Sequence, residues 1–149
     1  MIAKILVPSD GSKTAEIAAA YAVDLAKQLN ASITILSVID TRSLIAKTVA
    51  ASETVMDITE PIEDYLKEAA EQYTGKIKKL CDENGVASEI SIKAGHPVEE
   101  IVKEAKASKT DLIVMGSHGR SSLSATVFGS ISYGVIHNDK NIHVLIVRG

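Results

Sequence analysis

Small residues follow the apolar run Leu-Ile-Val-Met at residues 112–115, and their types and spacing suit the binding of an anion. The run has the length of a buried strand. It breaks at Gly116 and Gly119, and after nine further residues the pair Gly129-Ser130 opens a helical pattern. Glycine lets the backbone come close to an anion, and the free N–H groups of a helix start point at it. The stretch therefore predicts a site for the phosphates of a nucleotide.

The spacing of these small residues also carries a family resemblance. Nucleotide-binding members of the universal stress protein family have Gly, two residues, Gly, nine residues, Gly, and then Ser or Thr. This chain resembles them at four positions: Gly116, Gly119, Gly129 and Ser130. The family often continues with Val and then Ser or Thr, where this chain has Ile131 and Ser132, whose hydroxyl can still donate to phosphate. The resemblance implies that main-chain N–H groups and the Ser130 hydroxyl hold a triphosphate; the alternative is ordinary turn glycines with Ser130 as a helix N-cap.

Strand and helix patterns alternate along the whole chain, which predicts one α/β domain over residues 1–149. Strands are expected at residues 2–7, 32–39, 87–93, 112–115 and 142–147, and helices at 13–29, 60–84, 98–107 and 130–138. Residues 40–59 fit a loop with short helical pieces and are assigned no single state. The pattern predicts an open parallel sheet with helices on both faces. The resemblance implies a Rossmann-like five-stranded sheet in the order 3-2-1-4-5.

The turn Pro8-Ser9-Asp10-Gly11 follows the first strand, and the fourth strand ends at Met115. In the implied order these two strands are neighbours, and the winding of the sheet reverses between them. Ligands of such sheets bind beyond the C-terminal ends of the strands at this reversal. We therefore expect the main-chain N–H groups of both turns to meet at one crevice and to hold a polyphosphate.

Asp10 and Val38 are the candidate contacts for the nucleoside. The Asp10 carboxylate can accept from ribose hydroxyls or amino groups, or it can be a helix-start acid favoured by the helix dipole. The resemblance places Val38, at the end of the second strand, where the family's backbone meets the adenine edge. Its side chain also suits the core, so the sequence does not separate the two roles.

His118 and Arg120 are further candidate contacts for the phosphates. His118 can donate to phosphate, lie near a metal or simply fill the turn, and Arg120 can touch the γ-phosphate or stay exposed. No Gly-Lys-Ser/Thr sequence follows the glycines, so the loop is not a P-loop. We therefore expect ATP to bring a divalent ion, Mg²⁺ or Mn²⁺, held through its phosphates. The remaining histidines, His96, His137 and His143, show no metal-ligand spacing.

Composition excludes several classes of function. The 149 residues carry a net charge of −3 without a basic stripe, which argues against a nucleic-acid partner. No apolar run reaches the ~18 residues of a membrane span, and the start lacks a signal-peptide layout, so we expect a cytoplasmic protein. The single cysteine, Cys81, excludes an internal disulfide and fits a small filler on a helix.

The function that these observations favour is ATP binding used as a signalling or stress-response switch. Fast hydrolysis needs a positioned base and a cation, and Asp10, Glu53 and His118 have no visible partner, so we expect at most a weak ATPase. We expect ATP to order residues 120–128. An interaction scaffold without nucleotide and a small nucleotide-using enzyme, such as an adenylating one, are the alternatives.

The apolar terminal strand Val144-Leu145-Ile146-Val147 predicts self-association, since an exposed strand edge is normally covered. The family resemblance implies antiparallel pairing of this strand across a two-fold homodimer. The alternative is an edge covered by the chain's own helices.

Overall fold

The structure, a computed structural model, describes residues 1–41, 55–118 and 129–149. The strands are β1 (Lys4–Pro8), β2 (Ser32–Asp40), β3 (Ser88–Gly95), β4 (Leu112–Gly116) and β5 (His143–Val147). The helices are α1 (Lys13–Leu29), α3 (Val55–Glu83), α4 (Pro97–Ala107) and α5 (Ser130–Asn138). The strands form one sheet in the order β3-β2-β1-β4-β5, and every neighbouring pair is parallel. The predicted fold class and strand order are confirmed.

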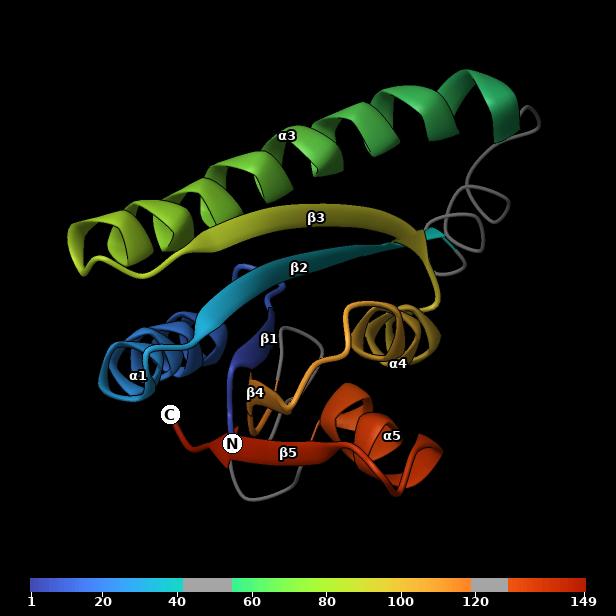
Figure 1. Ribbon diagram of the computed structural model, residues 1–149. Coiled ribbons are helices and arrows are strands. Elements are labelled where there is room, and N and C mark those ends of the chain that lie inside the picture. Colours follow the sequence, from blue (N-terminus) through green and yellow to red (C-terminus); the bar gives the residue numbers. More distant parts are fainter. Residues whose placement is uncertain (42–54, 119–128) are drawn as a thin grey trace.

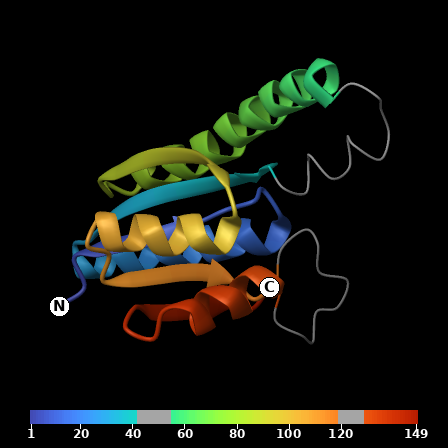
Figure 2. The same ribbon diagram turned by 90° about the vertical axis from the view of Figure 1, so that its right-hand side faces the viewer.

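Two layers of helices cover the two faces of the sheet (Figure 1). Helices α1 and α3 pack on one face, over an apolar cluster that includes Ile5, Val23 and Ile77. Helices α4 and α5 pack on the other, over a cluster that includes Leu6, Ile101 and Val135. The view in Figure 2 shows α4 and α5 lying together on this second face. None of the helices in the described ranges is long and apolar enough to cross a membrane.

Local signals set the bounds of α1. The Ser12 hydroxyl caps its start by accepting from the N–H of Ala15 at 3.2 Å. Its buried face is mostly alanine, which lets the helix lie close to the sheet. It ends where Asn30 adopts the left-handed conformation with φ of 55°. The expected helix over residues 13–29 is therefore found with the same bounds.

Several expected boundaries differ in the structure, and three of them involve proline or glycine. Helix α3 begins at Val55, before its expected start, so Pro61 lies inside it; the helix forgoes the bond that the missing proline N–H would have made. Strand β1 includes Pro8, which was expected to belong to the turn after it. Strand β3 runs to Gly95 and lies at the edge of the sheet, which suits its alternation of polar and apolar residues.

Cys81 lies on α3, where it faces the core and is fully buried. Burial raises the pKa of its thiol, and the hydrogen bond from Ser88 opposes this only in part. The thiolate form is disfavoured, so the side chain packs as a small apolar group.

Candidate functional site

A pocket opens beyond the C-terminal ends of β1, β2 and β4, where the winding of the sheet reverses. Its empty volume, which includes space open to solvent, is about 530 Å³. The turn after β1 and the turn after β4 both line it, as the implied strand order requires. Asp10 and Gly116, more than a hundred residues apart in the chain, therefore face one cavity.

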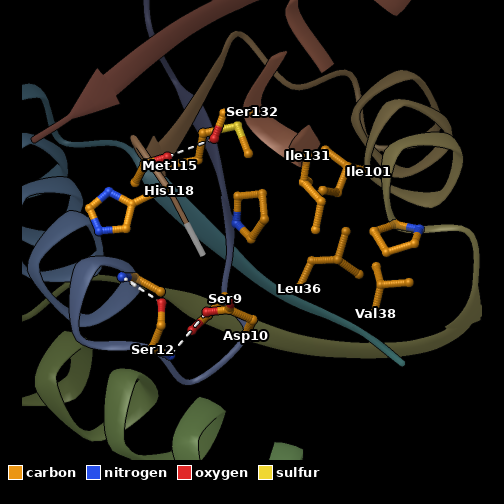
Figure 3. A pocket seen from close by; sticks show the side chains of 14 residues that line it. Ser9, Asp10, Ser12, Leu36, Val38, Ile101, Met115, His118, Ile131 and Ser132 are labelled. Atoms are coloured by element: carbon orange, nitrogen blue, oxygen red, sulfur yellow. Dashed lines mark hydrogen bonds between the residues drawn. The ribbon is translucent and has the colours of Figure 1, made fainter. Parts of the chain in front are cut away.

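The pocket has a polar end and an apolar end (Figure 3). The polar end carries hydroxyl, carboxylate and imidazole groups from Ser9, Asp10, Ser12 and His118. The apolar end is made by Leu36, Val38, Pro97, Ile101 and Ile131. A ligand that fits both ends has a flat or apolar part joined to a polar or charged part.

Three main-chain N–H groups in and after the turn that follows β1 are already hydrogen-bonded within the protein. Ser9 donates its N–H to the Leu36 carbonyl at 2.8 Å. The N–H of Gly11 bonds to the Ser9 hydroxyl at 3.2 Å, and the N–H of Ser12 bonds to Asp10 Oδ1 at 2.9 Å. The expectation that this turn offers its amides to a polyphosphate is wrong for these three groups. At Gly11 and Ser12 the cause is the short polar side chains, which fold back on the backbone and close the turn; the Ser9 N–H is taken by the neighbouring strand β2.

The β4 side of the pocket corrects two further expectations. Gly129 donates its N–H to the Ser117 carbonyl at 2.7 Å, so this amide is not available to phosphate. The Ser132 hydroxyl donates to the Gly116 carbonyl at 2.8 Å, so it holds the end of β4 and is not a free donor. Both bonds join the start of α5 to the end of β4 and fix where that helix begins.

The start of α5 differs from the turn after β1, because no side chain of the described residues caps it. Gly129 is its N-cap and makes no side-chain cap bond, and the first turn contains no acidic residue. Ser130 is the first residue of the helix, not its N-cap, and it is exposed. The first N–H groups of any helix lack an acceptor within the helix. Here they begin beside Ile131 and Ser132, which line the pocket.

Two contacts hold the turns on either side of the pocket together. The Thr14 hydroxyl, in the first turn of α1, donates to the His118 carbonyl. A Cβ on Gly116 would lie only 3.1 Å from the Thr14 carbonyl oxygen, so α1 passes directly over this glycine. His118 Nδ1 lies 3.2 Å from the Ser117 hydroxyl, and its ring lines the polar end.

Most of the residues expected at the site come together in this one pocket. Those that line it are Pro8, Ser9, Asp10, Val38, Met115, Gly116, His118, Ile131 and Ser132. Gly129 and Ser130 lie at the adjoining start of α5. Gly119 and Arg120 lie outside the described residues, as does Glu53. Their roles toward a ligand stay predictions.

Sequence reasoning missed three residues of the apolar end: Leu36, Pro97 and Ile101. Pro97 and Ile101 are four residues apart at the start of α4, which puts them on one helical face. That spacing indicates burial, but it does not tell what the face is buried against.

The pocket contains little protein charge to neutralise an anion. Among the residues that line it, Asp10 is the one carboxylate, and none is Lys or Arg. Within the described ranges, no three His, Cys, Asp or Glu side chains gather to hold a metal ion. A divalent ion here would have to rest mainly on ligand oxygens and water.

Comparisons with known proteins agree with this architecture. The model of the Universal stress protein family matches residues 1–148. The chain is 36% identical over 157 residues to Universal stress protein MJ0577 of Methanocaldococcus jannaschii, covering 99% of this chain and 96% of that protein. It is 35% identical over 147 residues to Universal stress protein MJ0531 of the same organism, covering 97% and 81%.

Solved structures share the fold over nearly the full length. The structure of MJ0577 matches with a TM-score of 0.81 at 34% identity, covering 99% of this chain and 96% of that one. A universal stress protein solved in complex with cAMP matches with a TM-score of 0.66 at 23% identity, covering 97% and 95%. At that identity the second match speaks for the fold alone.

Proposed function

This chain belongs to the universal stress protein family, and we propose that its pocket binds ATP, with the adenine at the apolar end and the phosphates at the start of α5. The observation that carries the proposal is that the apolar lining and the start of α5 meet in one cavity. An apolar lining can hold the faces of a base. A helix start without a side-chain cap offers N–H groups and the positive end of the helix dipole to phosphate.

The binding mode differs from the one expected from the sequence. The turn after β1 contributes its shape and the Asp10 carboxylate, because the amides of Ser9, Gly11 and Ser12 are already bonded. The phosphates then rely on the first turn of α5. A divalent ion, Mg²⁺ or Mn²⁺, would bind through phosphate oxygens and water and offset charge that no lysine or arginine of the described lining offsets.

The sharpest test identifies the ligand that travels with the protein. Purified protein is denatured and the released nucleotide is identified, and the emptied, refolded protein is titrated with ATP in a calorimeter. We expect ATP among the released molecules and saturable binding of one ATP per chain. Release of ADP would point to turnover. No release and no binding would contradict the proposal and favour an interaction scaffold.

We extend the proposal to a nucleotide-dependent switch in a stress response, with at most slow hydrolysis. The carboxylate and the imidazole of the described lining are engaged locally: Asp10 with the Ser12 N–H and His118 with the Ser117 hydroxyl. Limited proteolysis with and without ATP tests the switch, and identical cleavage patterns would contradict it. A phosphate-release assay tests turnover, and rates typical of dedicated ATPases would contradict slow hydrolysis.

We also propose a cytoplasmic homodimer joined through β5. This strand ends the sheet on one side, and its side chains from Val144 to Val147 are only partly buried. An apolar edge strand of this kind has backbone N–H and C=O groups that can pair with the same strand of a second copy. Light scattering over a dilution series tests it, and a monomer at micromolar concentration would contradict it.

A further inference from the structure

Gly134 lies in the middle of α5, where a glycine needs an explanation. The helix has only nine residues, and glycine destabilises a helix interior relative to alanine. Its neighbours on the buried side, Ile131 and Val135, continue an ordinary apolar face. Gly75 of α3, by contrast, has no atom within 4 Å of where a Cβ would stand.

The space beside Gly134 is taken by α4. A Cβ on Gly134 would lie 2.6 Å from Val98 Cγ2, which is closer than carbon atoms approach, and 3.3 Å from Val98 Cγ1, which is a tight contact. Val98 is β-branched and in the first turn of a helix, so its side chain has little freedom to rotate away. The absent side chain of Gly134 is therefore what lets α5 lie against α4 at this distance.

This close approach reaches the pocket. Ile131 precedes Gly134 by one helical turn on α5, and Ile101 follows Val98 by one turn on α4. Ile101 and Ile131 both line the apolar end and belong to the same packed cluster as Leu36. In Figure 3 they lie together on the helix side of the pocket, with Leu36 and Val38 on the sheet side. Moving α5 away from α4 would therefore separate Ile131 from Ile101 and widen the apolar end of the pocket.

We propose that Gly134 is a specificity-determining position: by allowing α5 to pack against Val98, it keeps the apolar end narrow enough to hold a flat base. The inference rests on the proposed binding of ATP. Gly134 is a positioning residue, since it is not among the residues that line the pocket and acts through Ile131. Its loss should weaken affinity for the base more than the hold on the phosphates, because Ile131 lies at the apolar end.

The test separates base from phosphate. Affinities for ATP and for inorganic tripolyphosphate, the latter by competition against a fluorescent ATP analogue, are measured for the unaltered protein, Gly134→Ala, the double variant Gly134→Ala with Val98→Ala, and Gly75→Ala. We expect Gly134→Ala to weaken ATP binding about three- to tenfold, as for other small changes of pocket shape, and to weaken tripolyphosphate binding clearly less. The double variant, which removes both Val98 methyl groups from the contact, should recover most of the loss. Gly75→Ala should bind both ligands like the unaltered protein.

The outcomes that would overturn the inference are distinct from failure of the proposed function. If the unaltered protein binds no ATP, the proposed function fails, and this inference with it. If it binds ATP but Gly134→Ala keeps the same ratio of ATP to tripolyphosphate affinity, this inference alone fails. Equal weakening for both ligands would indicate general loss of structure and would also overturn it. Circular dichroism confirms the fold of each variant, and the affinity ratio is measured within one folded sample.

Discussion

Helices α1 and α5 both begin at the rim of the sheet beside the pocket, but their first turns are built differently. In α1 the Ser12 hydroxyl accepts from the Ala15 N–H, and Glu16 places a carboxylate in the first turn. In α5 the N-cap is Gly129, which makes no side-chain cap bond, and no acid follows. The first helix therefore satisfies its own positive end with side chains, whereas no side chain of the described residues caps the start of the second.

Helix α4 follows the pattern of α1 and not that of α5. His96 caps it by accepting from the Val98 N–H at 3.2 Å, and Glu99 and Glu100 stand in its first turn. A capped helix start with its own carboxylates repels a further anion, whereas an uncapped one attracts it. The comparison supports our proposal that the phosphates bind at the start of α5 and not at the start of α1, although both turns at the rim contain glycine and serine.

The largest effect is expected when α5 is given the acid that it lacks. Ser130→Asp puts a carboxylate at its first residue, where we place phosphate. We expect ATP affinity to fall at least about tenfold, since like charges roughly 4 Å apart near a protein surface repel by about 4 kcal/mol. The free energy of unfolding should rise by about 0.3–1 kcal/mol, because the acid suits the helix dipole. Calorimetry and urea unfolding measure the two.

Ser130→Asn is the matched control, with the same shape and no charge. It should bind ATP clearly more tightly than Ser130→Asp, because it brings no negative charge to the helix start. Equal ATP affinity for Ser130→Asp and Ser130→Asn would contradict the placement of the phosphates at the start of α5, and with it the contrast between α1 and α5.

The second prediction concerns the contact that joins the two turns. Gly116→Ala would bring a Cβ to 3.1 Å from the Thr14 carbonyl oxygen, which belongs to a helix backbone and cannot rotate away. We expect a loss of about 1–3 kcal/mol in the free energy of unfolding, typical of overpacking, together with weaker ATP binding. Thermal or urea unfolding that matches the unaltered protein would show that α1 is free to move over β4.

The third prediction tests the capped member of the pair. Ser12→Ala removes the acceptor for the Ala15 N–H and should lower the free energy of unfolding by about 1 kcal/mol. Ser12→Asp, which keeps an acceptor at the N-cap, should recover most of this loss. If both variants unfold like the unaltered protein, the α1 cap contributes nothing to stability, and the cap no longer distinguishes α1 from α5.

The smallest effect lies at the far end of α5, which Asp139 closes. Its carboxylate accepts from the N–H groups of Asn141 and Ile142, and Lys106 Nζ lies 3.0 Å away; the Asn141 bond most of all lowers the pKa of Asp139. A lowered pKa in the folded state contributes stability that is present at neutral pH and is lost as the pH falls through that lowered pKa.

Asp139→Asn should therefore be less stable at neutral pH and should lose less stability on acidification. Urea unfolding between pH 7 and pH 3 measures the difference. Parallel pH profiles for the two proteins would rule out this role for Asp139.

Local chemistry decided much of this protein in advance. The bounds of α1 follow from the Ser12 cap, a row of alanines and the Asn30 stop, all neighbours in the chain. The bounds of α5 were also predicted correctly, from a pattern of nine residues. The strand order came from the family resemblance at Gly116, Gly119, Gly129 and Ser130, and the parallel sheet agrees with it. Helix α3 was placed wrongly at its start: the sequence pattern predicted it from residue 60, next to Pro61, and in the structure it begins at Val55.

The site needed the folded chain, because a hydrogen bond joins groups that the sequence keeps far apart. Sequence patterns mark Leu36 and Ile101 as apolar and buried, but only packing brings them into one pocket. Serines and glycines indicate a turn that could bind phosphate, but they do not tell which N–H groups remain available. The bond from Gly129 to Ser117 settles that, since an amide already paired within the protein cannot also hold a ligand.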